Sequence, residues 1–347
     1  MIQFSFYLIS LVGIIASCNK QNNPGNNNIA PTNLTVSATI SADNSGNVSF
    51  TAAATNAITY DFDFGNGIFQ TVASGIVTYK YPASGTYTVN VMAKSAAGLT
   101  ISKNIQVTVT VTVMLSLLWG DEFDIPGSPD PAKWGYDLGD GCPGVCGWGN
   151  NELEWYTNRQ QNAVVQGGVL KIIAIRESFN GKQFTSARLL SKDKFSFKYG
   201  KIEVRAKLPA GVGTWPAIWM LGNNINTTAW PACGEIDIME HRGSQLNTIS
   251  AALHHPGHSG GNADASTVVI SNATTEFHKY ALEWSAGTIK FLVDDVAFYT
   301  FPNTGSLPFN QNFFILLNVA MGGNYGGAVD PAFTSAAMEI DYVRVYQ

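Results

Sequence analysis

The most informative stretch of the chain reads ACGEIDIMEH at residues 232–241 and places three carboxylic acids, Glu235, Asp237 and Glu240, close together. Side chains alternate faces along an extended strand, so Glu235 and Asp237 share one face while Glu240 would point to the other. One extra residue in a β-bulge restores the phase, and bulges occur beside active sites because they redirect a side chain. We therefore predict a bulge at residues 238–239 that brings the three acids to one face of one strand.

Two interpretations of the three acids are open. In the first, they serve glycoside hydrolysis with retention, in which a nucleophile and an acid/base lie roughly 5–5.5 Å apart. In the second, they are solvated acids of an edge strand that alternate with core residues. The first is favoured because like charges this close repel one another, and a purely structural strand gains nothing from them.

A second motif, WPAIWMLG, precedes the acids at residues 215–222. Together the two motifs resemble glycoside hydrolase family 16, in its bulge-containing laminarinase-type branch, and the resemblance runs from Trp119 to the C-terminus. It implies a retaining hydrolase with Glu235 as nucleophile and Glu240 as general acid/base. Asp237 would orient Glu235 through a shared proton and, while charged, help to keep Glu240 protonated.

The resemblance also implies a cleft lined by aromatic rings, because the C–H face of a sugar ring is apolar. It places Trp215 and Trp219 in that cleft, although the apolar neighbours of Trp219 would also suit a core position. Three further substrate contacts are implied by position, at Asn151, Arg188 and His254.

No cofactor is required for this chemistry, but members of the family often carry a structural calcium ion. Glu122, the carbonyl of Gly168 and Asp341 match that site by position, and oxygen ligands suit calcium. His255 and His258 are interpreted as loop residues, because their spacing fits no usual zinc pattern and no cysteine or acid accompanies them in the sequence.

A chain of 347 residues has room for two domains. Its 34 glycines, 12% aromatic residues and 13% charged residues indicate an all-β protein with many turns. In residues 117–347, strand follows strand: residues 201–208 alternate apolar with charged side chains, and residues 313–319 are almost all apolar. This pattern predicts a concave two-sheet jelly-roll β-sandwich.

We predict that residues 32–113 form a separate, smaller domain, an immunoglobulin-like β-sandwich. In residues 87–93, one face carries Tyr87, Val89, Val91 and Ala93 and the other carries Thr88, Asn90 and Met92, which is typical of a half-buried strand. The stretch YDFDFGNG at residues 60–67 resembles a polycystic-kidney-disease-type (PKD) module. Such a module acts as a spacer or as a weak carbohydrate binder, and the spacer is preferred because no cluster of exposed aromatic residues stands out.

The N-terminus reads as a targeting segment. Residues 1–17 are interpreted as a signal peptide, because the apolar run at residues 4–15 is short for a membrane span. The small residues before Cys18 resemble a lipoprotein box, which would leave a lipid on Cys18 and the protein on the cell surface or outer membrane; ordinary secretion is the alternative. Residues 18–31 are an Asn-rich linker. Both routes lead to export.

Three other cysteines remain. Cys142 and Cys146 are close enough in sequence to form a local disulfide in an oxidising compartment, or they stay reduced. Cys233 is most simply a small buried hydrophobe.

The expected partner is an uncharged polysaccharide, since a formal charge of −5 gives no basic surface for nucleic acid. The motifs favour endo-hydrolysis of 1,3-β-glucan such as laminarin, including mixed-linkage glucan. Two alternatives stay open: a hydrolase of galactans of the agarase or carrageenase type, and a non-catalytic β-glucan-binding protein. A monomer is expected.

Overall fold

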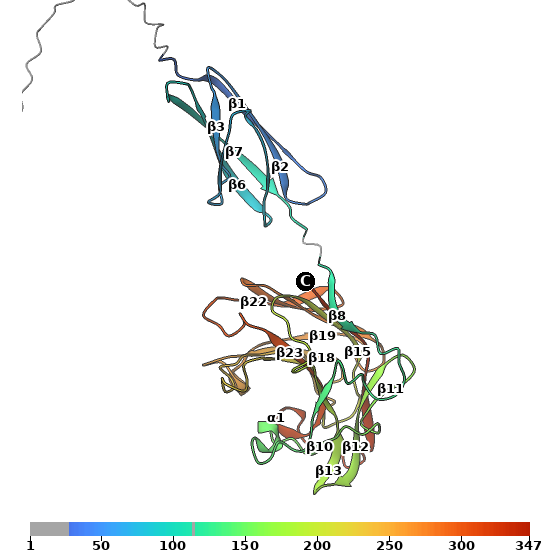
Figure 1. The fold of residues 1–347 in the computed structure, drawn as a ribbon. Coiled ribbons are helices and arrows are strands. Elements are labelled where there is room, and N and C mark those ends of the chain that lie inside the picture. The colour runs from blue at the N-terminus through green and yellow to red at the C-terminus, as the bar shows by residue number, and fades with distance from the viewer. Residues whose placement is uncertain (1–27, 113–114) are drawn as a thin grey trace, which may run out of the picture. The chain divides into compact units, whose positions relative to one another are not determined.

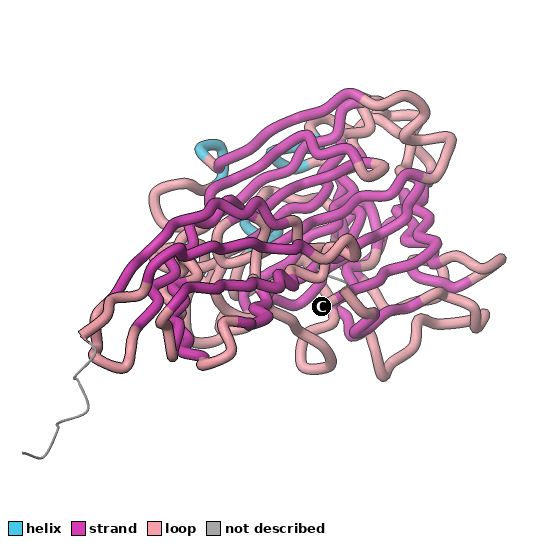
Figure 2. The backbone as a smooth tube through the Cα atoms, turned by 90° about the horizontal axis from the view of Figure 1, so that it is seen from above, coloured by secondary structure: helices cyan, strands magenta, loops and turns pink. Residues whose placement is uncertain are grey.

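The computed structural model describes residues 28–112 and 115–347 (Figure 1). The predicted signal peptide, Cys18 and most of the predicted linker lie outside the described residues. The chain divides into two compact units, and the boundary between them lies between Met114 and Leu115. Figure 2 shows that strands and loops make up almost all of the described backbone, which confirms the all-β class. No helix within these ranges is long and apolar enough to cross a membrane.

The first unit is a sandwich of a three-stranded sheet, ordered β1-β2-β5, and a four-stranded sheet, ordered β4-β3-β6-β7. Inward-facing aromatic and β-branched side chains such as Phe50, Phe62 and Val91 form its core, as the two-residue alternation predicted. The strands are β1 (Thr32–Ile40), β2 (Asn47–Thr55), β3 (Thr59–Asp63), β4 (Phe69–Val72), β5 (Ile76–Lys80), β6 (Gly85–Lys94) and β7 (Thr100–Val109).

The second unit contains a ten-stranded sheet, ordered β10-β13-β12-β24-β15-β20-β21-β22, with β11 beside β12 and β8 beside β24. Its strands are β8 (Leu117–Asp121), β10 (Glu154–Tyr156), β11 (Ala163–Val165), β12 (Leu170–Phe179), β13 (Lys182–Ser186), β15 (Gly200–Lys207), β20 (His278–Trp284), β21 (Thr288–Val293), β22 (Val296–Pro302) and β24 (Ser335–Tyr346).

A seven-stranded sheet, ordered β19-β18-β17-β16-β23-β14-β9, packs against it. Its strands are β9 (Gly135–Asp137), β14 (Arg188–Leu190), β16 (Thr214–Gly222), β17 (Glu235–His241), β18 (Thr248–His254), β19 (Asp264–Val269) and β23 (Phe313–Met321). The described helical turns are short: η1 (Cys146–Gly149), η2 (Gly260–Asn262) and α1 (Gly323–Gly326).

One continuous apolar core fills the space between these two sheets. Ile202 and Val204 of β15 enter it from the ten-stranded sheet, and Ile315 and Leu317 of β23 enter it from the seven-stranded sheet. Every residue of β23 is buried, as its apolar sequence predicted. The second unit is therefore a two-sheet jelly-roll sandwich, and the seven-stranded sheet has an outer face directed away from the core.

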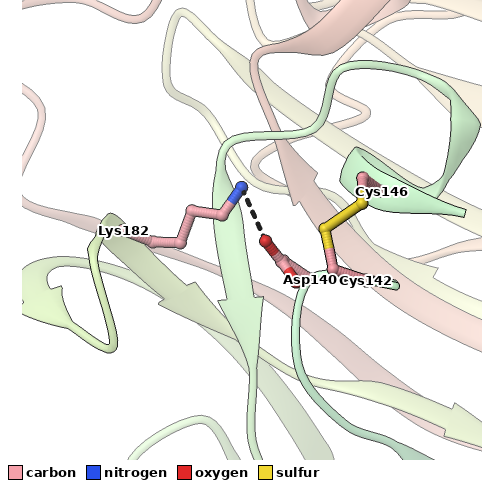
Figure 3. Close-up of a disulfide and its surroundings, with 4 residues drawn as sticks. All are labelled: Asp140, Cys142, Cys146 and Lys182. Atoms are coloured by element: carbon pink, nitrogen blue, oxygen red, sulfur yellow. Dashed lines mark hydrogen bonds and ion pairs between the residues drawn. A yellow bond between two sulfur atoms is a disulfide. The ribbon is translucent and has the colours of Figure 1, made fainter. Parts of the chain in front are cut away.

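The loop between β9 and β10 is held by a disulfide between Cys142 and Cys146 (Figure 3). Lys182 on β13 contacts the carboxylate of Asp140 in the same loop at 3.2 Å. Of the two alternatives that the sequence left open, the structure has the disulfide. Cys233 is buried and free, as predicted.

Candidate active site

The predicted bulge is present in β17. On β18, Asp237 pairs with Ala252 and Glu240 pairs with Ser250, so three steps along β17 match two steps along β18. On β16, Ile218 pairs with Met239 and Trp219 with Asp237, which leaves Ile238 as the extra residue. The bulge therefore lies where the spacing of the acids required it.

The bulge sorts the side chains of β17 onto two faces. Ile236, Ile238 and Met239 all belong to the core. Glu235 and Glu240 are partly accessible, and the side chain of Asp237 keeps only 5% of its surface exposed. Because the apolar residues occupy the core face, the three acids share the outer face of the seven-stranded sheet.

Each outer acid accepts a hydrogen bond from an indole ring. Trp215 on β16 donates its Nε1–H to Oε1 of Glu240 at 2.9 Å. Trp230, in the loop before β17, donates its Nε1–H to Oε2 of Glu235 at 3.1 Å. These donors fix the orientation of both carboxyl groups, since a bond of this length restricts side-chain rotation.

His254 stands over the middle of the group. Its Nε2 lies 2.9 Å from Oδ2 of Asp237 and 3.6 Å from Oε1 of Glu235. The backbone N–H of Gly260 donates to its Nδ1 at 3.1 Å, so the proton of the neutral ring sits on Nε2 and faces the acids. The structure thus brings His254 into the group, as the resemblance implied, and gives Asp237 the histidine as its nearest polar partner.

The three acids share an environment that disfavours charge. Burial raises the pKa of Glu235, Asp237 and Glu240 to about 8 each. The charge of Asp237 raises the pKa of both glutamates further, while His254 lowers it. The group therefore retains protons near neutral pH, and ionisation of one acid favours the protonated form of its neighbours.

Arg188 lies on the same face, on β14. It is held by an ion pair with Asp137 at 3.0 Å and lies between two indole rings, 4.4 Å from the centre of Trp148 and 4.8 Å from that of Trp219. Its positive charge lowers the pKa of Glu235. The arginine therefore supports the ionised form of that acid and holds the rings beside it.

Trp219 is half-buried and packs against a small apolar cluster that is separate from the main core, so it is not a residue of that main core. Its Nε1–H donates to Asn318 at 2.8 Å, and the Asn318 amide donates in turn to the hydroxyl of Tyr156 at 3.0 Å. That hydroxyl donates to the buried carboxylate of Glu152, also at 3.0 Å. This chain of buried bonds fixes the plane of the Trp219 ring.

Asn151, the remaining predicted substrate contact, lies at the rim of the site. Asn151 is exposed and donates to the side chain of Asn324 in α1 at 2.8 Å. Tyr325 in α1 lies 5.3 Å from the ring of Trp215 and below the guanidinium of Arg242 at 4.5 Å. The β9–β10 loop and α1 therefore meet beside Trp215.

Several of these residues were missed by sequence reasoning. They lie outside the two quoted motifs: Trp230 in the loop before β17, Asn318 on β23, Trp148 in η1 and Tyr325 in α1. The one usable signal was at Trp230, an exposed tryptophan followed by Pro231 just before the acids. Aromatic residues in a loop next to a strand of acids are candidates for sugar contacts.

His255 and His258 lie in the loop between β18 and β19, as predicted, but the expectation that no acid accompanies them is wrong. His255 is buried, and both imidazoles contact the carboxylate of Asp264, at 2.8 and 3.1 Å. The acid was hidden from sequence reasoning because it stands at the start of the next strand, across an intervening loop.

Of the predicted calcium ligands, Asp341 belongs to β24, and Gly168 and Glu122 lie just outside the two strands that pair with it. Leu170 pairs with Ile340 and Asp121 pairs with Val343, so β12 and β8 approach the same edge of β24 from its two ends. That register brings Gly168 and Glu122 to the level of Asp341, and their oxygen atoms suit calcium. Both carboxylates already have arginine partners: Arg344 binds Glu122 at 2.8 Å, and Arg205 binds Asp341 at 2.6 Å.

Acids that hold protons near neutral pH serve general acid–base chemistry, and indole rings suit the apolar faces of sugars. Fold and site thus define a β-sandwich hydrolase of carbohydrates. Residues 149–344 match the model of glycosyl hydrolases family 16, and residues 33–111 match that of the PKD domain. The chain belongs to glycosyl hydrolases family 16 and carries a PKD domain before the catalytic unit.

Three relatives show the extent of the similarity. A beta-glucanase from Rhodothermus marinus is 44% identical over 247 residues, which is 67% of this chain and 85% of the relative. The catalytic domain of an endo-1,3-beta-glucanase (laminarinase) from Thermotoga petrophila is 40% identical, with a TM-score of 0.63, and covers 67% of this chain and 98% of its own. LamA from Z. galactanivorans, solved with laminaritriose and laminaritetraose, is 45% identical, with a TM-score of 0.62, over 67% and 99% of the two chains.

Proposed function

We propose that this protein is a retaining endo-acting glycoside hydrolase that cleaves 1,3-β-glucosidic bonds in β-glucans such as laminarin. One observation carries the proposal: the bulge in β17 places two glutamates, each with its own indole donor, on the same sheet face as Asp237. The family supports retention, and the relatives named above support the 1,3-β-glucan substrate.

The reaction proceeds in two displacements. Glu235, ionised beside Arg188, attacks the anomeric carbon while Glu240 gives its proton to the departing glycosidic oxygen. The bond from the anomeric carbon to that oxygen breaks as the bond to the Glu235 carboxylate forms. Glu240, now ionised, then takes a proton from water, whose oxygen displaces Glu235 and restores the original configuration.

Asp237 and His254 position these two acids. Asp237 lies between them in sequence and beside both in space, so its charge raises the pKa of Glu240 and keeps the acid protonated. The Nε2–H of His254 faces Asp237 and is within 3.6 Å of Glu235. A proton that moves among these groups lets Glu235 ionise without placing two adjacent negative charges in a buried site.

Aromatic rings bind the sugar units on either side of the cleaved bond. Trp215 and Trp219 lie beside the acids on β16, and the exposed ring of Trp230 lies beside Glu235. Arg188 and Asn151 offer polar contacts to hydroxyl groups. The apolar C–H face of a sugar can stack on the large apolar face of an indole ring, so several rings together hold a chain along the sheet.

The two alternatives have weaker support. A sulfated or galactose-based chain calls for free cations in the cleft, whereas Arg188 is paired with Asp137 and Arg242 is stacked on Tyr325. A purely binding protein has no use for three acids whose pKa burial raises to about 8, since ionising them costs stability.

The test combines a panel of substrates with variants that distinguish the nucleophile Glu235 from the acid/base Glu240. Reducing-sugar release is measured on laminarin, lichenan, agarose and carrageenan, and proton NMR follows the first anomer formed from laminarin. We expect release from laminarin with the β-anomer first. Glu235→Ala should lose at least about 10³-fold in kcat and regain turnover with azide as an α-glycosyl azide, whereas Glu240→Ala should give the β-azide. Full activity of Glu235→Ala would refute the assignment.

Two further proposals concern the rest of the chain. We infer export, by secretion or as a lipoprotein anchored at Cys18, and the disulfide between Cys142 and Cys146 supports an oxidising compartment. We also propose that a calcium ion is bound by Glu122, the Gly168 carbonyl and Asp341, where it would stabilise the sandwich. Calcium should raise the Tm of the purified protein above its value in EDTA, and Glu122→Gln should remove that difference.

A further inference from the structure

A second cluster of side chains lies between β18 and β19. His255 directly follows β18, and Asp264 is the first residue of β19. Nε2 of His255 lies 2.8 Å from Oδ2 of Asp264, and Nδ1 of His258 lies 3.1 Å from the same oxygen. Two imidazole nitrogen atoms therefore contact the same carboxylate oxygen, and these three atoms are all possible metal ligands.

The backbone holds the two imidazoles in place. The N–H of His255 donates to the carbonyl of His258 at 2.8 Å, and the reverse bond is 2.9 Å long. Pro256 and Gly257 form the turn between them, and Gly257 has a φ of +85°, as the third position of a type II turn requires. The rings lie 4.8 Å apart with an angle of 17° between their planes. The site is therefore organised before any ligand arrives.

The cluster combines a rigid interior ligand with an accessible one. The side chain of His255 keeps 8% of its surface exposed and packs against Phe301 and Phe309. The side chains of Asp264 and His258 keep 26% and 50%. An ion can thus enter from solvent past His258 and reach a ligand whose orientation is fixed by packing.

We propose that His255, His258 and Asp264 bind Zn²⁺ or a transition-metal ion of similar softness. Three protein ligands and one open position for water are a common zinc arrangement, and the three ligand atoms already lie within 4.8 Å of one another. Tetrahedral bonds of about 2.0–2.1 Å place ligand atoms roughly 3.4 Å apart, so the 2.8 and 3.1 Å separations between the nitrogens and the Asp264 oxygen need to lengthen by only a few tenths of an ångström each. Calcium and magnesium prefer oxygen ligands and are excluded.

The site is coupled to the catalytic face through one short segment. Gly260, which donates its N–H to Nδ1 of His254, lies between His258 and Asp264. A bound ion ties both ends of this segment together. The ion therefore braces the loop that orients His254 and takes no part in the bond cleavage itself.

The experiment measures zinc binding to the full chain by isothermal titration calorimetry at pH 7.5. Glu235, Asp237 and His254 form another group that could hold a metal ion, so all variants are compared in a Glu235→Gln background. We expect His258→Ala and Asp264→Asn each to lose one zinc equivalent or to bind it at least 100-fold more weakly. The matched control is His278→Ala, which removes another histidine paired with an aspartate, Asp294 at 2.7 Å, without a third ligand among the described residues.

The zinc equivalent should persist in His278→Ala, and an excess of calcium should not displace it. Because His258 is half-exposed, its variant is expected to keep the metal-free Tm, and Asp264→Asn gives an independent loss that preserves side-chain shape. Zinc binding that is unchanged in both variants, or lost equally in His278→Ala, would overturn the proposal.

Discussion

At the scale of single residues, the indole of Trp215 sets the proton affinity of the acid/base. Its Nε1–H donates to Glu240, and this hydrogen bond lowers the pKa of that carboxyl against the effect of burial. Trp215→Phe keeps an aromatic ring but removes the donor. The pKa of Glu240 should rise, so the alkaline limb of the profile of kcat/KM against pH should move to higher pH.

Trp219→Phe is the matched control for this prediction. Its Nε1–H donates to Asn318, which does not titrate, so this variant should weaken substrate binding and leave the alkaline limb where it is. Equal movement of the limb in both variants, or none in Trp215→Phe, would remove Glu240 from the role of acid/base.

Burial of these acids also lowers the stability of the folded state at pH values where they would otherwise be ionised. Burial raises the pKa of Glu240 to about 8 from an ordinary value of 4.5, so between these pH values the folded state keeps a proton that the unfolded state releases. Stability therefore falls as pH rises through this window. Glu240→Gln removes the effect. Its catalytic unit should gain up to about 5 kcal/mol over the wild type at pH 8.5, or up to about 10–20 °C in Tm, and little at pH 4.5.

The exposed Glu276→Gln variant controls for loss of a surface charge and should follow the wild type at both pH values. Calorimetric scans that give the same advantage to Glu240→Gln at pH 4.5 and pH 8.5 would show that its gain does not come from titration.

The positions of individual site residues could be predicted from the sequence where the spacing between residues indicates which face of a strand they occupy. The three acids break the two-residue period of a strand by one position, and only a bulge repairs this, so their common face was predictable. Trp230, Trp148 and Asp264 were not, because nothing local says which loop folds back onto which strand. Their contacts arise from long-range packing, which a linear pattern does not encode.

At the scale of the element, the bulge in β17 can be tested by changing its length. Opposite the bulge, the neighbouring strand β16 has one residue fewer than β17. Its consecutive residues Ile218 and Trp219 pair with Met239 and Asp237, and Ile238 has no partner on β16. Deletion of Ile238 leaves a regular strand in which residues 235, 237 and 240 still alternate with apolar side chains. The variant should fold and keep measurable activity on laminarin, reduced by the lost core contact of Ile238.

Deletion of residues 238–239 together gives the opposite result. It brings Glu240 next to Asp237 and turns its carboxylate toward the core, where an unpaired charge is strongly destabilising. We expect no activity and a lower Tm. Similar activity in the single and double deletions would mean that the phase of the strand does not control the position of Glu240.

Whole elements were predictable to different degrees. The apolar run at 313–319 and the alternation at 201–208 predicted β23 and β15, because burial on both faces or on one face leaves a direct trace in the sequence. The helical turns η1 and α1, which border the site, were not predicted. Their glycine-rich sequences fit several loop conformations, and tertiary contacts select one of them.

At the scale of the whole molecule, the two units have separate cores. The core of the first contains Phe50, Phe62 and Val91, and the core of the second contains Ile202 and Leu317, without a shared residue among those described. All residues named above on the catalytic face and its rim lie between residues 137 and 325. The two-unit organisation was predictable because the alternating pattern of the first unit gives way to a new set of strands near residue 117.

The catalytic unit alone, residues 115–347, should therefore fold, since its core is complete and about 230 residues bury enough surface to be stable. It should hydrolyse soluble laminarin with a kcat within about twofold of that of the full chain. The PKD unit then contributes only reach or attachment. A comparison of both forms on soluble laminarin and on an insoluble 1,3-β-glucan separates these roles: a spacer leaves both rates unchanged, whereas a carbohydrate binder raises only the rate on the insoluble substrate. Loss of activity on soluble laminarin in the shorter form would show that the catalytic unit depends on the PKD unit.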